Sequence, residues 1–209
     1  MRHGVPRIVP RTGSTQAERI RGIREDLPAG EHVLWQGAPS WTALAIRVFH
    51  VRSVAIYFLL LSVGSLEMTT HAGEPATAAL AVAALGAVAC GLLATLAWLA
   101  ARTTIYAITT RRVFMRIGIA LPISVNLPLH RIESAGLGVH DDGTGDLPLQ
   151  LGAEVHLAYL HLWPHVRPWR LRRTEPMVRA VSDPAQVARI LGDALHRAAS
   201  ARNACAEST

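Results

Sequence analysis

Ten histidines make metal or pigment binding the first chemistry to consider in this sequence. His161 and His165 are four residues apart, a spacing that lets two imidazoles on one helix share a metal ion. Pro164 lies between them and breaks any such helix. The other histidines considered are scattered along the chain, at His3, His50, His71 and His130. The sequence therefore predicts no metal site and no cofactor.

The acidic residues do not form a catalytic pattern either. Asp141, Asp142 and Asp146 surround two glycines and resemble a calcium loop, but the downstream glutamate of an EF-hand is missing. A hairpin turn explains this cluster better. All 21 basic residues are arginine, which excludes chemistry that needs a lysine. No catalytic triad or carboxylate pair stands out, so we do not expect an enzyme.

A short segment rich in tryptophan and arginine is the candidate binding site. Arginine and tryptophan are favoured at lipid headgroups and at protein interfaces. The candidate residues for binding a partner or lipid are Trp163, Arg167, Trp169, Arg170, Arg172 and Arg173. A solvated loop near the membrane is the alternative. Nucleic acid is not expected as a partner, because an anionic bilayer would compete for these cations.

The composition indicates a membrane protein. Half of the residues are hydrophobic and 17% are charged, against about 25% in an ordinary soluble domain. Residues 76–101 contain no charge, and as a helix they would span about 39 Å, more than the roughly 30 Å of a hydrocarbon core. Residues 53–68 form a second, shorter apolar segment. We expect two transmembrane helices, joined as a hairpin over residues 53–101.

The distribution of arginine predicts the orientation of this hairpin. Arg47 and Arg52 precede the first segment, and four arginines follow the second between residues 102 and 116. The connection between the segments, residues 67–75, holds two glutamates and no arginine. The positive-inside rule then places both termini in the cytoplasm. Cys205 lies in a reducing compartment and Cys90 in lipid, so both are expected as free thiols.

Small residues form one face of the second apolar helix. Gly86, Cys90, Ala94 and Ala97 follow one another at spacings of four, four and three. Such a helix-packing face lets another helix approach closely. It packs against the chain's own first helix or docks a partner helix. Neither apolar segment contains a histidine, so the chain is not expected to be a pigment-binding antenna subunit.

The remaining segments predict a small soluble domain. Residues 1–24 are expected to be a flexible basic tail, and residues 25–52 a pre-membrane segment with a strand at 32–35 and an interfacial helix from Trp41. Short β-prone runs from residue 105 to 181, including 155–162, predict an antiparallel barrel or sandwich. A helix that begins after Asp183 closes the domain, which covers residues 102–200, and residues 201–209 are expected to be a tail. The fold class is a membrane α-hairpin with an α+β domain.

The start of this domain resembles the bacterial pleckstrin-homology (PH-like) family. Residues 106–113 read YAITTRRV, similar to the family's opening pattern Y-x-I-T-x-x-R-V. Residues 126–133, the Gly-Thr-Gly turn at 143–145 and the helix start at 183–187 fit the same pattern, as does the segment 31–40 before the hairpin. The resemblance covers about residues 25–197 and implies a PH-like fold.

Residues 158–165 and 167–170 are in addition similar to the photosynthetic complex assembly proteins of purple bacteria. That resemblance implies a non-enzymatic, multi-pass protein of the bacterial inner (intracytoplasmic) membrane that helps to assemble the reaction centre with light-harvesting complex 1. Its implied partners are reaction-centre and core antenna subunits and membrane lipids, and a homo-oligomer is possible. The alternative is a PH-like module that binds anionic lipids without a photosynthetic client.

Overall fold

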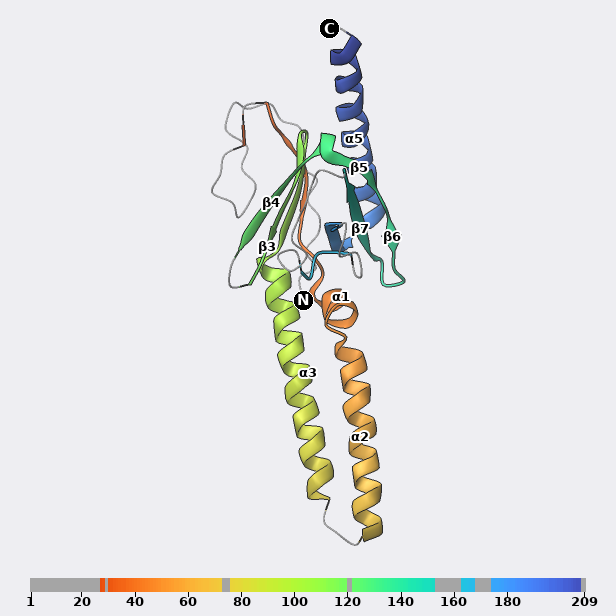
Figure 1. Cartoon of the computed structure of the whole chain (residues 1–209). Coiled ribbons are helices and arrows are strands. Elements are labelled where there is room, and N and C mark those ends of the chain that lie inside the picture. The colour runs from red at the N-terminus through yellow and green to blue at the C-terminus, as the bar shows by residue number, and fades with distance from the viewer. Residues whose placement is uncertain are drawn as a thin grey trace. The chain divides into compact units, whose positions relative to one another are not determined.

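The computed structural model describes residues 27–28, 30–72, 76–119, 122–152, 163–167 and 174–207 (Figure 1). The chain divides into two units. Residues 41–102 form a helical hairpin, and the residues before and after it form a β-domain. The predicted basic tail, residues 1–24, and the strand expected at 155–162 lie outside the described residues.

Two long apolar helices make up most of the hairpin. Helix α2 (Val51–Ala72) has 22 residues and helix α3 (Thr77–Thr103) has 27. At 1.5 Å per residue they measure about 33 and 40 Å, so each can cross a hydrocarbon core of about 30 Å. Both helices are longer than the segments expected from the sequence. None of the residues of α2 is buried, and most of its large apolar side chains are exposed.

The helix expected from Trp41 to Arg52 is interrupted. Helix α1 (Trp41–Arg47) has seven residues, and α2 begins at Val51. His50, between them, has a φ of 51°, in the left-handed region that a continuous α-helix excludes. Arg52 therefore belongs to the first long helix, and the short helix α1 is a separate element.

The first sheet of the β-domain has four antiparallel strands in chain order. They are β1 (Val33–Gly37), β2 (Ile105–Thr109), β3 (Arg112–Ile117) and β4 (Ile123–Pro128). We expected the first of these to belong to a pre-membrane segment over residues 25–52, apart from the domain. It instead pairs with β2 along the edge of the sheet. Sequence patterns reveal a strand but not its distant partner, which explains the difference.

The pairing of β1 with β2 makes the helical hairpin an insertion. Gly37 at the end of β1 lies opposite Tyr106 near the start of β2, and the strands are antiparallel. The two strands therefore form a β-hairpin in which the helical unit takes the place of the turn. Both ends of the helical unit connect to the same end of this strand pair.

The second sheet is centred on β7 (Thr144–Leu151). β5 (Ile132–Ala135) and β6 (Gly138–Val139) pair with one of its edges, and β8 (Met177–Ser182) pairs with it as well. Thr144–Asp146, expected in a turn, are the start of β7. Antiparallel sheets and a C-terminal helix were predicted and are found. The described strands form two hydrogen-bonded sheets, and no strand pair among them joins one sheet to the other.

The core lies between the two sheets and the C-terminal helix α5 (Pro184–Glu207). Alternate residues of β3, Val113, Met115 and Ile117, point into it, together with Trp35 of β1. Leu191 of α5 is 1% exposed. Phe114 faces the other side of the sheet, where it packs with Leu27 and Val33, among others. These two residues belong to the N-terminal segment, by which we mean the described residues before α1. Both faces of the sheet's centre are therefore covered.

Helix α5 runs further than the sequence predicted. We expected the domain to end at residue 200 and a tail to follow, whereas the helix continues to Glu207. Residues 198–207 contain five alanines, the residue with the highest helix propensity. Arg202 also donates a hydrogen bond to the carbonyl oxygen of His130, at 3.3 Å. Asp183 caps the first turn as predicted, since its Oδ1 accepts from the N–H of Gln186.

The first prediction tests the inserted hairpin. Replacing residues 41–102 with a short Gly/Ser linker should give a soluble β-domain that unfolds cooperatively, because β1 and β2 then close an ordinary β-hairpin. A chain that begins at Thr103 should be less stable by about 3 kcal/mol, since it lacks buried Trp35. Urea unfolding followed by circular dichroism measures both. Equal midpoints for the two chains would show that β1 is dispensable.

Candidate functional site

The tryptophan–arginine segment is described only in part. Trp163 and Arg167 lie within a turn over residues 163–167, whereas Trp169, Arg170, Arg172 and Arg173 lie outside the described residues. Trp163 is 52% exposed. The guanidinium group of Arg167 forms an ion pair with Glu175, 2.9 Å between Nη1 and Oε2. Trp163 is thus largely exposed, and Arg167 helps to hold the turn.

Backbone contacts fix this turn to the chain that leads into β8. The N–H of Arg167 donates to the carbonyl oxygen of Glu175, and the N–H of Met177 donates to that of His165, both at 3.0 Å. Arg179 donates to the carbonyl oxygen of Pro164, also at 3.0 Å. Three consecutive residues, Pro164 to Val166, are buried. Trp163, before these three residues, is exposed, and Arg167, after them, is half-buried.

His165 ties the same turn to the start of β2. Its Nδ1 lies 2.5 Å from the hydroxyl of Tyr106, and its Nε2 lies 3.1 Å from the hydroxyl of Thr104. The N–H of Arg179 donates to the Tyr106 oxygen at 3.3 Å. The phenol therefore donates to Nδ1, which leaves Nε2–H to donate to Thr104. This chain of bonds satisfies both nitrogens of a completely buried imidazole.

The protonation states of His165 and Tyr106 follow from their burial. Burial and then the positive charge of Arg179 lower the pKa of His165 to about 3. Burial raises the pKa of the Tyr106 phenol well above its ordinary value. Both side chains are thus neutral at physiological pH. His165 is a structural residue here, and no group of three His, Cys, Asp or Glu that could hold a metal is found in the described part of the chain.

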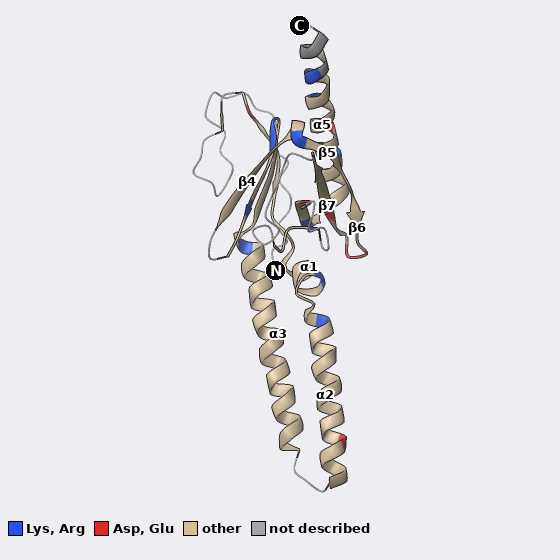
Figure 2. Ribbon diagram, in the orientation of Figure 1, with Lys and Arg blue, Asp and Glu red and all other residues tan. Residues whose placement is uncertain are grey.

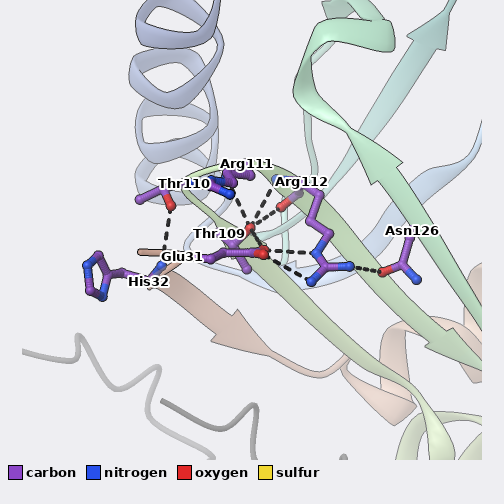
Figure 3. Close-up of polar contacts among 7 residues, drawn as sticks. All are labelled: Glu31, His32, Thr109, Thr110, Arg111, Arg112 and Asn126. Carbon is purple, nitrogen blue, oxygen red and sulfur yellow. Dashed lines mark hydrogen bonds and ion pairs between the residues drawn. The ribbon is translucent and has the colours of Figure 1, made fainter. Parts of the chain in front are cut away.

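A second polar cluster joins the N-terminal segment to the β2–β3 hairpin (Figure 3). Glu31, 4% exposed, receives two hydrogen bonds from the guanidinium of Arg112, from Nε at 2.8 Å and from Nη2 at 2.9 Å. The Thr109 hydroxyl donates to the same carboxylate at 2.6 Å and accepts from the N–H of Arg112 at 3.0 Å. Asn126 accepts a longer bond from Arg112, at 3.5 Å. We call Glu31, Thr109 and Arg112 the clasp.

The clasp keeps Glu31 ionised although it is buried. Burial by itself raises the pKa of this carboxyl group. Hydrogen bonds from Arg112 and Thr109, and the charges of Arg112 and Arg111, outweigh burial and hold the pKa below the usual 4.5. A bidentate arginine–carboxylate pair of this kind is strong and directional. The clasp therefore stabilises the attachment of the N-terminal segment to the sheet.

These two clusters and the core explain the residue types of the motif Y-x-I-T-x-x-R-V. Tyr106 binds His165, Thr109 and Arg112 hold Glu31, and Ile108 and Val113 are buried in the core. Sequence reasoning found the motif but missed Glu31 and His165 as its partners. Glu31 gives a signal as an acid directly ahead of an apolar strand, and His165 was noticed only for its spacing from His161.

The predicted packing face of α3 lies partly against α2. Gly86 and Ala97 are buried, and Cys90 and Ala94 are half-buried. A Cβ atom at Gly86 would come within 2.5 Å of Phe58 on α2, so glycine permits the close approach of the two helices there. At Gly86 this face serves the hairpin's own packing.

The acidic cluster near Gly143 forms the turn between β6 and β7. Asp142 accepts from the N–H and the hydroxyl of Thr144, at 3.0 and 2.7 Å. Asp146 accepts from the N–H of Ala180 at 2.8 Å and lies 3.3 Å from His140. Gly143 has a φ of 76°, which favours glycine. The interactions described for these two acids are structural.

Comparison with known proteins decides the family. A family model for the bacterial PH domain matches residues 55–195, which is more than half of the chain. The chain belongs to the bacterial PH domain family. It is also 38% identical over 179 residues to an uncharacterized 23.7 kDa protein in the puhA 5′ region of Rhodobacter capsulatus, a match that covers 83% of each chain. No solved structure matches it significantly.

The region that the family model matches includes Thr109 and Arg112 of the clasp but not Glu31. The matched region of this bacterial PH domain begins inside α2 and leaves out β1 and Glu31. Strand β1 thus lies outside the matched region, and the clasp ties the residue range just before it to β3.

The second prediction concerns the clasp. Arg112→Ala leaves a buried carboxylate without its cation and should lower the free energy of unfolding by about 3 kcal/mol. Glu31→Gln should cost less, about 1 to 2 kcal/mol, because an amide still accepts a hydrogen bond. Urea unfolding of the full chain in detergent measures these values. Asn126→Ala is the matched control and should change little, given its long bond to Arg112.

The same variants predict a pH dependence. Because the pKa of Glu31 is lowered on folding, its contribution to stability is complete above about pH 4.5 and is lost as the pH falls through the folded value. The stability difference between wild type and Glu31→Gln should therefore shrink at acidic pH. A stability difference that stays constant with pH would show that Glu31 is not coupled to Arg112. Additive losses of stability in the double variant Arg112→Ala, Glu31→Gln would show the same.

Proposed function

We propose that this protein is a membrane-anchored assembly factor for the photosynthetic reaction centre and its light-harvesting 1 core antenna, acting as a scaffold without catalysis. The observation that carries the proposal is the relative in the puhA 5′ region, since puhA marks a photosynthesis gene region in Rhodobacter capsulatus. Identity of 38% over most of both chains supports a shared role. The resemblance of residues 158–165 and 167–170 to assembly proteins of purple bacteria points the same way.

Membrane insertion of the hairpin is part of the proposal. Figure 2 shows the charges of the helical unit gathered at its ends: Arg47, Arg52 and Arg102 at one end and Glu67 towards the other. This asymmetry supports an orientation with the arginine end in the cytoplasm. Arg102 also stacks on Trp98, with Cζ 4.8 Å from the ring centroid, and such a pair suits the headgroup region.

The pairing of β1 with β2 supports two crossings independently of charge. Gly37 and Tyr106 are neighbours in one sheet, so the chain must leave and return on the same side of the membrane. An even number of crossings meets this condition, and α2 and α3 supply two. Helix α1 has only seven residues and is too short to cross.

The client-binding role falls to the arginine-rich part of the candidate segment. Trp169, Arg170 and Arg172 follow the anchored turn within seven residues. Arginine offers planar donors and tryptophan a large apolar surface, which together suit the cytoplasmic end of a membrane-protein client.

An anionic-lipid-binding module is the second candidate function. It is favoured by the excess of arginine, with 21 basic against 15 acidic residues, and by the three arginines at one end of the hairpin. Such binding should weaken steeply with salt and should not depend on photosynthetic subunits. Flotation with vesicles at rising salt, with and without purified core complex, separates the two functions.

The third prediction concerns topology. A reporter fused after Thr209 or before Arg2 should be active only in the cytoplasm, because β1 and β2 share one sheet and the arginines flank the hairpin. A tag inserted at residues 69–75 should be labelled only from the periplasm. A cytoplasmic tag at that position would exclude a hairpin that crosses the membrane.

The fourth prediction tests the function itself. Deleting the gene in a purple bacterium should lower the near-infrared absorbance of the core complex in membranes, and the wild-type gene should restore it. The triple variant Trp169→Ala, Arg170→Ala, Arg172→Ala should restore it poorly, although its level in membranes stays normal.

A matched control removes exposed arginines elsewhere. Arg189→Ala with Arg197→Ala takes two exposed cations from α5 and should restore the core complex fully. Normal core absorbance in the deletion strain would refute the assembly function. Full rescue by the triple variant would refute only the role of the segment.

A further inference from the structure

Trp163 is held in an unusual way for an exposed tryptophan. Trp163 is 52% exposed, whereas the next three residues are buried and their segment is hydrogen-bonded to the chain that leads into β8. The turn is therefore rigid on its inner side and presents one large amphipathic ring to the outside. Because the backbone behind the ring is already held, binding a surface costs mainly the side-chain freedom of Trp163.

The inner side of the turn is joined to the residue that follows the second long helix. Helix α3 ends at Thr103, β2 begins at Ile105, and Thr104 is the single residue between them. His165 binds the side chain of this residue. The turn thus connects to the chain at the point where it leaves α3.

The end of α3 has residue types that favour a lipid interface. Trp98 is 42% exposed, and Arg102 stacks on its ring. Thr104 follows Arg102 by two residues, a distance of at most about 7 Å. The headgroup layer adds about 6 Å beyond each side of the hydrocarbon core. When α3 spans the hydrocarbon core, Thr104 therefore lies within or next to the headgroup layer.

We propose that residues 163–167 form a membrane-interfacial foot of the β-domain, with the indole of Trp163 among the lipid headgroups and His165 as the positioning residue that holds it there. The proposal rests on the membrane insertion proposed above, and it assigns Trp163 to lipid rather than to a protein client. Tryptophan prefers the headgroup region because its ring is apolar and its N–H is polar. Arg167, paired with Glu175, supports the turn.

The test places a fluorescent probe at Trp163 in the full-length protein. In a Cys90→Ala, Cys205→Ala background, Trp163→Cys is labelled with an environment-sensitive dye and reconstituted into vesicles of phosphatidylglycerol and phosphatidylcholine. Headgroup-spin-labelled lipid is the quencher. We expect blue-shifted emission and strong quenching at this site.

Two further sites calibrate the signal. Tyr57→Cys, on α2 and 59% exposed, reports insertion of the hairpin through quenching by acyl-chain spin labels. His130→Cys is exposed and lies beside the β2–β3 turn, at the other end of β2 from Thr104, and should stay unquenched. Quenching at 163 should exceed that at 130 severalfold.

The outcomes separate this inference from the proposed function. If the probe at position 163 is exposed to water while the probe at position 57 is quenched by acyl-chain spin labels, the hairpin is inserted but residues 163–167 do not contact the headgroups. This result overturns the foot and leaves membrane insertion intact. A probe at 163 that is shielded but not quenched by lipid indicates a protein contact and also overturns it. Absence of quenching at 57 overturns membrane insertion and the foot together.

A separate set of variants tests the role of His165. His165→Ala should lose most of the quenching at 163 and keep that at 57, because the turn is released from Thr104. Leu191→Ala destabilises the buried core without touching the turn and should keep the quenching at 163. His165→Gln, which retains a donor and an acceptor, should restore part of the signal. Unchanged quenching in His165→Ala would overturn the positioning role.

Discussion

The pairing of β1 with β2 is the constraint on which the rest of the structure depends. These strands are separated by the whole helical unit in sequence, and yet Gly37 lies opposite Tyr106. Their ladder closes a very long loop, whose entropic cost grows only slowly with length. The helical hairpin contributes its own compactness and reduces the cost further. Once the ladder forms, Trp35 completes the main core, and Leu27 and Val33 cover the opposite face of the sheet.

Two buried polar clusters secure that arrangement at opposite ends of β2. The clasp holds the N-terminal segment at the β2–β3 turn, and His165 holds the 163–167 turn at Thr104. Their energetics differ. Glu31 is charged and buried, so it depends on Arg112 for compensation, whereas His165 is neutral and needs only its two hydroxyl partners. Neutrality lets His165 remain in the interior without a counter-ion.

Local patterns predicted the elements well, and distant pairings poorly. The two apolar helices, most strands of the β-domain and the Asp183 cap are visible in the sequence, because they depend on hydrophobic period and capping chemistry. The place of β1, the break at His50 and the length of α5 were missed. The first depends on a partner some seventy residues away, and the second on a single backbone angle.

The candidate site shows the same division between local and distant information. Trp163 and Arg167 stood out by type, but their different roles could not be read from spacing. An arginine paired with a buried glutamate and an arginine free to bind a ligand look alike in sequence. His165 was considered as a possible metal ligand because of His161, and its actual partners come from the end of α3 and the start of β2.

An inserted hairpin connects the PH domain to the helical unit twice, whereas a single tether would connect it once. A single helix with a flexible linker would leave the domain free to rotate. Here two connections enter the same strand pair, through residues 38–40 and through Thr104 alone. Two short connections allow less rotation than one flexible linker. In the function proposed above, such a restriction before binding would lower the entropic cost of meeting a client.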